Sequence, residues 1–328
     1  MGPAEHLGIP ITSDVGRMRH IRGVRMLREV SVVVPTHNRP ELMKLAVESV
    51  LAQKTSVGGE VIIVFDACPI EVPELEIPEG WIVRGIANSR SRGLAGARNS
   101  GIDAAEGRLV AFLDDDDEWL SGKLDAQLRR FEEKPEAIVV GTAMIIDDGE
   151  STHVRLVPDE ELSHEAFLRN RNPGLHSSSL MFRRELLLGE LGLIDEDLPR
   201  SYGEDYDILL RASSLGLVSV VNEPLVRVLW KGQSYYFGQW ASYAEALQYL
   251  LRKHPDFASI PAALGRIEAQ VAFALAASGD ARGARAWARK ALRHNPKQVK
   301  AVLAVAISWK LVTPQTITKI VQKLGRGI

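Results

Sequence analysis

A run of four aspartates at the end of an apolar segment is the feature that most constrains the fold of this chain. Residues 109–113 read Leu-Val-Ala-Phe-Leu, which is typical of a buried β-strand, and Asp114 to Asp117 follow directly. Adjacent carboxylates repel one another, so gathering them in a folded chain is costly without a cation. Ligands bind at the carboxyl ends of strands in parallel sheets, so the run lies where a site is expected.

The same run predicts a metal cofactor. Carboxylate oxygens are the preferred ligands of Mg²⁺ and Mn²⁺. Such an ion can bridge two phosphates and offset the charge that builds on a departing nucleoside diphosphate. A solvated acidic turn, or a helix N-cap before Trp119, is the structural alternative. The position at the end of a strand favours the metal, and we expect Mn²⁺ or Mg²⁺.

Strands and helices alternate along the first half of the chain. This alternation is typical of a largely parallel sheet with helices on both faces, an α/β fold. Strands are predicted at residues 30–35, 60–65, 81–84, 109–113, 137–146, 177–182 and 218–221. Helices are predicted at 40–53, 94–106, 123–131, 160–169 and 204–215.

The chain becomes helix-like and rich in alanine from Trp240 onward. Residues 263–295 are interpreted as two helices around Gly279 and Asp280, and they resemble one tetratricopeptide-type hairpin, a unit that cannot bury its own face alone. We therefore divide the chain into a basic N-terminal tail (1–28), an α/β domain (29–238) and a small all-α C-terminal domain (239–328). The hairpin is expected to pack on the α/β domain or on a second copy, as a homodimer.

Charge is distributed unevenly. The whole chain has a net charge of −2, yet residues 251–328 hold 14 Lys and Arg against three acidic residues. Residues 1–250 are therefore acidic overall, which disfavours nucleic-acid binding because that needs clustered Lys and Arg. Residues 299–323 combine an apolar run with Lys300, Lys310, Lys319 and Lys323, and are too short and too charged to span a bilayer. This basic C-terminus could contact an anionic membrane, or dock as a terminal helix with a solvated basic face.

The expected location is cytoplasmic, with peripheral contact at the inner face of the membrane. The single cysteine, Cys68, excludes an internal disulfide framework and fits a reducing compartment. The first 28 residues are polar, contain several arginines and have no apolar stretch of signal-peptide length.

Several motifs occur together in the order found in the family 2 glycosyltransferases. The segments Val32–Arg39 (VVVPTHNR), Arg98–Ile102 (RNSGI) and Gly107–Trp119 (GRLVAFLDDDDEW) resemble the core of that family, and the similarity extends from about Val30 to Arg227. The resemblance implies a GT-A fold with a Rossmann-like mixed sheet. It also implies inverting transfer of a sugar from a nucleotide diphosphate donor, with a UDP-sugar as the expected donor.

The resemblance assigns the nucleotide to residues after the first two strands. Pro35, Thr36 and Arg39 are expected to hold the nucleoside, although a turn with a helix cap also explains the first two. Asp66 stands second in a pair that is usually Asp-Asp and here reads Phe-Asp, and it is expected to accept a hydrogen bond from the base. Arg98 suits a pyrophosphate, with a structural surface arginine as the alternative.

The aspartate run supplies the Asp-x-Asp element of the family. The resemblance makes Asp116 the main metal ligand and places Asp114 nearer the ribose, as a further ligand. Asp115 is assigned to the nucleotide site. Asp117 is expected to support its neighbours or to orient the following helix.

The segment Tyr202–Asp207 (YGEDYD) resembles the Glu-Asp motif that supplies the catalytic base in this family. The chemistry needs one carboxylate to accept the proton of the acceptor hydroxyl. We place that role on Asp205, with Glu204 orienting it. The alternative is an acid-rich helix start, which the helix dipole favours.

The acceptor site is the least constrained part of the prediction. His176, Trp230 and Lys231 are candidates, although a plain loop histidine and core packing of Trp230 explain two of them equally well. A glycan, a lipid-linked sugar and a peptide all remain open as acceptors. A catalytically inactive transferase-like domain, acting as a nucleotide-binding or scaffold module through its helical C-terminus, is the alternative function.

Overall fold

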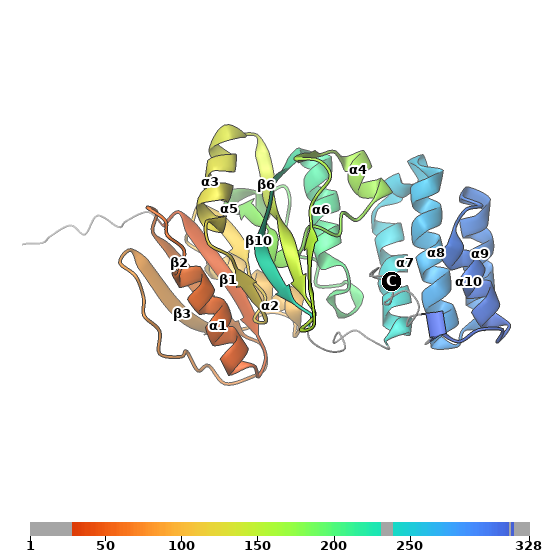
Figure 1. Cartoon of the computed structure of the whole chain (residues 1–328), viewed down its shortest axis with the longest axis horizontal. Helices are drawn as coiled ribbons and strands as arrows, with labels where there is room; N and C mark the ends of the chain where they lie inside the picture. The colour runs from red at the N-terminus through yellow and green to blue at the C-terminus, as the bar shows by residue number, and fades with distance from the viewer. Residues whose placement is uncertain (1–27, 231–238, 315, 318–328) are drawn as a thin grey trace, which may run out of the picture.

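The computed structural model describes residues 28–230, 239–314 and 316–317, and a ten-stranded mixed sheet forms its body (Figure 1). The strands are β1 (Val30–Thr36), β2 (Gly59–Phe65), β3 (Trp81–Ala87), β4 (Leu109–Phe112), β5 (Asp117–Trp119), β6 (Ala137–Asp147), β7 (Thr152–Arg155), β8 (Glu161–Leu162), β9 (Met181–Arg183) and β10 (Leu217–Leu229). Their order across the sheet is β3-β2-β1-β4-β9-β6-β10-β5, with β7 paired to β6 and β8 to β10.

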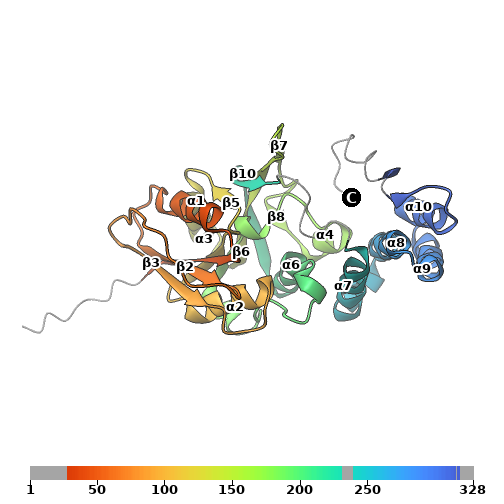
Figure 2. The same ribbon diagram turned by 90° about the horizontal axis from the view of Figure 1, so that it is seen from below.

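The first four strands are parallel and fulfil the expected alternation. Helix α1 (Pro40–Leu51) covers one face of this part of the sheet and α2 (Leu94–Ala104) the other (Figure 2). Side chains of β1 alternate between the two cores because a strand has a period of two residues: Val32 and Val34 pack on the α1 side, and Val33 on the α2 side.

A glycine sets the distance between α2 and the sheet. A Cβ at Gly101 would lie 2.2 Å from Cγ1 of Val33, which leaves no room for any side chain there. The small residue therefore lets α2 approach β1 closely, and it fixes the height at which Arg98, one turn earlier, reaches the end of the sheet.

The second half of the sheet departs from simple parallel pairing. Strand β9 is antiparallel to both β4 and β6, and it joins them, whereas β6 and β10 are parallel to each other. Strand β5 contains Asp117 and pairs antiparallel with β10. The remaining helices of this part are α3 (Lys123–Glu133), α4 (His164–Arg169), α5 (Arg184–Leu187) and α6 (Glu204–Leu215).

Three sequence predictions need correction here. Residues 160–169 are helical only from His164, because Ser163 caps the helix by accepting the N–H of Ala166, and the preceding residues pair as β8. Residues 177–179 form a 3-10 turn before β9, not a strand. Strand β10 runs to Leu229, well beyond the predicted end at residue 221, since β6 offers a partner along its whole length.

Four helices follow, α7 (Trp240–Lys253), α8 (Pro261–Ser278), α9 (Ala281–His294) and α10 (Val299–Ser308), and they stack side by side at one end of the molecule (Figure 1). The predicted hairpin around Gly279 is confirmed as α8 and α9, and Gly279 has φ of +96°, a conformation that favours glycine. Leu250 of α7 and Ile267 of α8 belong to the same core cluster as Leu209 of α6. The α/β domain and the first C-terminal helices thus share one core.

No helix in the described ranges is long and apolar enough to cross a membrane. The predicted basic tail lies outside the described residues apart from Arg28, as do Lys231, Lys319 and Lys323.

Candidate active site

The aspartate run lies beside the end of β1, as the sequence predicts. Strands β1 and β4 are neighbours and parallel, so their carboxyl ends meet. Thr36 Oγ1 donates a hydrogen bond of 2.8 Å to Asp115, which is buried. Arg39 Nη1 lies 2.7 Å from an oxygen of Asp116 and 3.2 Å from one of Asp115. Two of the three residues predicted for the nucleoside therefore contact the acidic run directly.

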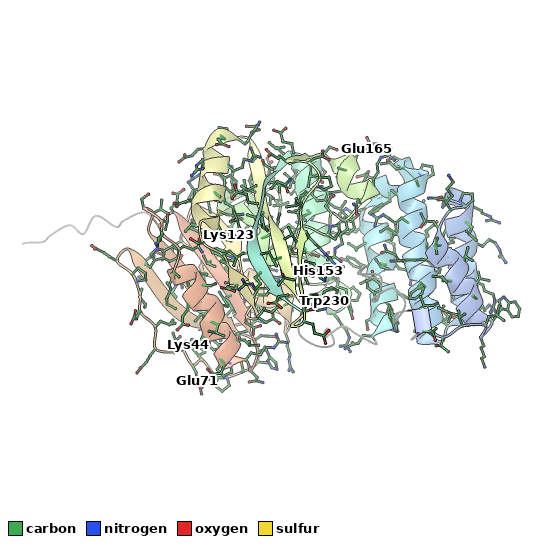
Figure 3. The ribbon with its side chains drawn as sticks, in the orientation of Figure 1. Lys44, Glu71, Lys123, His153, Glu165 and Trp230 are labelled. Carbon is green, nitrogen blue, oxygen red and sulfur yellow. The ribbon has the colours of Figure 1, made fainter. Side chains whose placement is uncertain are left out.

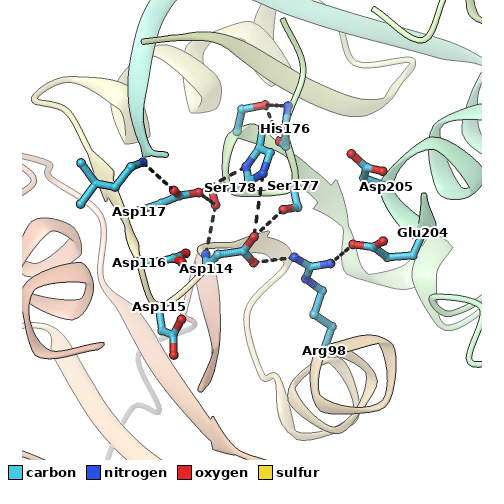
Figure 4. Close-up of polar contacts among 12 residues, drawn as sticks. Arg98, Asp114, Asp115, Asp116, Asp117, His176, Ser177, Ser178, Glu204 and Asp205 are labelled. Atoms are coloured by element: carbon cyan, nitrogen blue, oxygen red, sulfur yellow. Dashed lines mark hydrogen bonds and ion pairs between the residues drawn. The ribbon is translucent and has the colours of Figure 1, made fainter. Parts of the chain in front are cut away.

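The other two aspartates contact the 3-10 turn at residues 177–179. Ser177 donates a hydrogen bond of 3.0 Å to Asp114, and Ser178 donates to Asp117 through its hydroxyl (Figure 4). His176, at the start of this turn, has Nδ1 3.3 Å from an Asp117 oxygen and Nε2 4.0 Å from Asp114. These hydrogen bonds from its side chains to the carboxylates stabilise a 3-10 turn where the sequence predicted a strand.

Asp114, Asp117 and His176 form a group that could hold a metal ion. One ligand atom from each lies within 4.8 Å of the others. Carboxylate ligands suit Mn²⁺ and Mg²⁺, whereas an imidazole is a ligand typical of Zn²⁺ and other transition-metal ions. Asp114 belongs to the sequence-predicted ligand pair, whereas Asp116 lies against Arg39 in this conformation. Asp117 and His176 were not predicted as ligands: Asp117 was expected to support its neighbours or orient the following helix, and His176 was a candidate for the acceptor site.

The electrostatics of the run also fit a cation. Burial, together with the neighbouring carboxylates of Asp114, Asp117 and Asp115, raises the pKa of Asp116 to about 6, and Arg39 opposes this rise. Burial lowers the pKa of His176, but Asp117 and Asp114 outweigh burial and raise the pKa to about 9. An imidazolium therefore balances part of the negative charge, a role that a divalent ion can take over.

Arg98 connects the aspartate run to the predicted base motif. Its guanidinium is 1% exposed, donates to Asp114 through Nη2, and lies 2.6 Å from Glu204 through Nη1. Burial opposes its charge, but the two carboxylates raise its pKa above the ordinary value. Arg98 is therefore buried and not the surface arginine of the alternative, and its contact with a diphosphate stays a prediction.

Asp205, the predicted base, begins helix α6 next to Glu204 and is paired with Arg171. Arg171 Nη2 lies 2.8 Å and 2.7 Å from the two Asp205 oxygens. Burial would raise the pKa of Asp205, but the Arg171 charge outweighs burial and lowers it. Burial raises the pKa of Glu204, with Asp205 adding to the rise and Arg98 opposing it. Sequence reasoning missed Arg171, because a loop arginine 34 positions earlier carries no local signal.

The remaining candidates lie at different places around this edge. Asp66 accepts hydrogen bonds from Asn88 Nδ2 at 2.8 Å and from the Gly93 N–H at 2.9 Å, so it fixes the loop before α2. Pro35 is buried at the end of β1. Trp230 is 44% exposed beyond the end of β10 (Figure 3), so core packing does not account for it.

Comparisons with known proteins find a matching family model and several similar proteins. Residues 31–188 match the family model described as Glycosyl transferase family 2. Over 202 residues the chain is 34% identical to the succinoglycan biosynthesis protein ExoO of Rhizobium meliloti. The aligned segment covers 57% of this chain and 56% of that protein. Over 195 residues it is 27% identical to the UDP-Glc:alpha-D-GlcNAc-diphosphoundecaprenol beta-1,3-glucosyltransferase WfgD of Escherichia coli, covering 59% and 73%. The chain thus spans little more than half the length of the first of these relatives.

Solved structures support the expected fold. TarS 1-349 of S. aureus in complex with UDP-GlcNAc superposes with a TM-score of 0.58 at 15% identity, over 91% of this chain and 92% of that one. The mannosyltransferase PcManGT of Pyrobaculum calidifontis, in complex with GDP-Man and Mn²⁺, gives 0.51 at 19% identity, over 89% and 83%. The predicted GT-A-type mixed sheet with a helical C-terminal region is confirmed.

Proposed function

We propose that this chain, whose residues 31–188 belong to glycosyl transferase family 2, transfers a sugar from a nucleotide diphosphate donor to an acceptor hydroxyl with inversion. One observation carries the proposal. Arg98 joins Asp114 of the aspartate run to Glu204 of the base motif, so residues expected for donor and for base share one edge of the sheet.

The donor proposed is a UDP-sugar. Pro35, Thr36 and Arg39 would hold the nucleoside, with Asp66 as acceptor for an N–H of the base. Support comes from the contact of Thr36 and Arg39 with the aspartate run, and from the named donor of the Escherichia coli relative. Asp115, held by Thr36, would complete the nucleotide site.

Mn²⁺ or Mg²⁺ is the proposed cofactor. Asp114 would hold it, together with Asp116 by the family resemblance or with Asp117 and His176 by their proximity. When bound, the ion supplies positive charge beside the diphosphate and so favours its departure. The protein groups around it, Arg39 and the serines of the 3-10 turn, would keep the carboxylates in place.

Asp205 is the proposed general base, and it would remove the proton from the acceptor hydroxyl. As that proton moves to the carboxylate, the acceptor oxygen forms a bond to the anomeric carbon and the bond from that carbon to the diphosphate oxygen breaks. One displacement inverts the anomeric configuration. The lowered pKa keeps Asp205 ionised at neutral pH, and Glu204, held by Arg98, would orient it.

The acceptor proposed is a lipid-linked glycan. The Escherichia coli relative is named for a diphosphoundecaprenol acceptor, and so is a Campylobacter jejuni relative, 32% identical over 167 residues. His176 beside the run and the exposed Trp230 are proposed to contact it, with Lys231 outside the described residues. Such an acceptor is consistent with the proposed place at the cytoplasmic face of a membrane.

Calorimetric titration of UDP, with and without Mn²⁺, tests the donor site. We expect Mn²⁺ to strengthen UDP binding to the wild type and Asp116→Ala to abolish that gain. Asp159→Asn, at an exposed acid without a partner in the described residues, is the matched control. No UDP binding by the folded wild type would exclude the UDP assignment. Binding without turnover of any UDP-sugar would favour the inactive nucleotide-binding module.

A further inference from the structure

The outer end of the helical stack carries a surface that the proposed transfer reaction does not use. Helices α9 and α10 form this end of the molecule (Figures 1 and 2). A groove between them is lined by Arg285, Arg289, Leu292, Arg293 and Val305. We call this groove, with the exposed apolar residues of α10 and its C-terminal turn, the α9/α10 face.

Within the described part of the chain, the arginines of the α9/α10 face have no carboxylate partners. In the ranges 28–230, 239–314 and 316–317, none of Arg285, Arg289 and Arg293 forms a salt bridge. Residues 281–314 contain no Asp or Glu at all. Positions 285, 289 and 293 recur every four residues, so the three side chains form one row along the helix. This is a strip of positive charge without compensation.

An apolar row runs beside the arginines. Val299, Val302 and Trp309 are 68%, 55% and 64% exposed, and Leu311 just beyond the helix is 76% exposed. Their spacing places the first three on one side of α10. The Arg285 guanidinium lies 5.0 Å from the centre of the Trp309 ring, so the basic and apolar rows meet. Exposed apolar side chains grouped in this way mark an interaction surface.

We propose that the α9/α10 face docks on a bilayer that contains anionic phospholipids. Arginines beside apolar and tryptophan side chains are the combination that interfacial helices present to lipid headgroups and acyl chains. The guanidinium groups bind the phosphates of the headgroups. Trp309 enters the interfacial region, where an amphipathic ring is favoured.

The same observations disfavour a second copy of the chain as the occupant. A twofold interface uses one patch on both subunits, so it would bring two arginine rows close together with no carboxylate between them. Repulsion between the rows opposes such a dimer. An anionic bilayer, in contrast, matches both the arginine row and the apolar row of the face, because it offers phosphates to the first and acyl chains to the second.

Co-sedimentation of the full chain with vesicles tests the proposal without any transfer assay, so its failure is distinguishable from failure of the proposed function. We expect binding to vesicles of phosphatidylcholine mixed with phosphatidylglycerol, and far weaker binding to phosphatidylcholine alone. The double variant Arg289→Gln/Arg293→Gln should bind the anionic vesicles about thirtyfold more weakly. Trp309→Ser should also weaken binding, and raised salt should weaken the wild type.

The control is a double variant with the same loss of charge elsewhere. Lys54→Gln/Arg129→Gln removes two exposed cations of the α/β domain that have no carboxylate partner in the described part of the chain. It should bind the vesicles as the wild type does. Equal losses in the two double variants would overturn the proposal, because the effect would then be one of net charge. A wild-type dimer in light scattering that Arg289→Gln/Arg293→Gln dissociates would overturn it in favour of a second copy.

Discussion

Arg98 and Glu204 form a buried ion pair across 106 positions of sequence, with Nη1 2.6 Å from Oε1. The same guanidinium donates to Asp114. The end of β4 and the start of α6 are therefore held together by one cation. Because all three groups are largely buried, the arrangement is stable only while the charges remain balanced.

We expect Arg98→Gln to destabilise the fold by about 3–5 kcal/mol, because Asp114 and Glu204 would be left with uncompensated buried charge. Urea unfolding at neutral pH measures this loss. Adding Glu204→Gln to the first change should recover part of the stability, since one of the two stranded charges is removed. Arg129→Gln, at an exposed arginine of α3, should stay within about 0.5 kcal/mol of wild type. An equally small loss for Arg98→Gln would show that the pair contributes little.

Removing Arg171 should change the pH dependence of transfer. Arg171 holds the pKa of Asp205 below its ordinary value, so the proposed base is active down to low pH. With Arg171→Gln, burial dominates and the pKa of Asp205 rises, which moves the acidic limb of the kcat/KM profile to higher pH. The matched control is Arg169→Gln, two residues away, where the arginine pairs with Glu165 at the surface. An unmoved acidic limb would argue against Asp205 as the base.

Metal binding can decide between two ligand sets that share Asp114. Proximity adds Asp117 and His176, whereas the family resemblance adds Asp116. If His176 is a ligand, His176→Gln should weaken Mn²⁺ binding at least about tenfold, measured by electron paramagnetic resonance of free Mn²⁺. His153→Gln, at an exposed histidine of β7, is the control. Unchanged Mn²⁺ affinity in His176→Gln, with loss in Asp116→Asn, would support the resemblance instead.

Asp207 should stabilise the fold above about pH 4. It is fully buried, and His254, Arg211 and Lys253 outweigh the effect of burial and lower its pKa to about 2. A depressed folded-state pKa contributes stability that is present above the unfolded-state pKa and is lost as pH falls toward the folded value. Asp207→Asn should therefore lower the free energy of unfolding by roughly 2 kcal/mol at pH 7, and the difference between wild type and variant should narrow between pH 4 and 2. Urea midpoints across that range measure this difference in stability, and a difference that does not change with pH would contradict the prediction.

The local pattern of apolar residues was sufficient to predict the first half of the fold. The apolar runs of β1, β2 and β4 are continuous, and the helices that connect β1 to β2 and β3 to β4 favour parallel strands. The aspartate run could therefore be assigned to the edge of the sheet from sequence alone. Its contact with Thr36 follows from the same parallel arrangement.

The parts that were missed depend on contacts between distant residues. A run of serines after His176 has no strong preference, and the choice of a 3-10 turn comes from hydroxyl bonds to Asp114 and Asp117. Arg171 reaches Asp205 only after α4 and α6 pack together. Burial of Arg98 likewise needs both carboxylates in place, which no spacing within one segment encodes.

The core shared by α6, α7 and α8 bears on how this chain could be shortened or recombined. Leu250, Phe257 and Ile267 pack with Leu209 of the helix that begins at the proposed base, and Lys253 and His254 pair with Asp207 of that helix. A chain cut at residue 238 would expose the apolar side of that helix and leave Asp207 with Arg211 as its remaining cationic partner. The smallest unit that could be grafted onto another protein with its chemistry intact therefore extends at least through α8, whose other face is buried against α9 and α10.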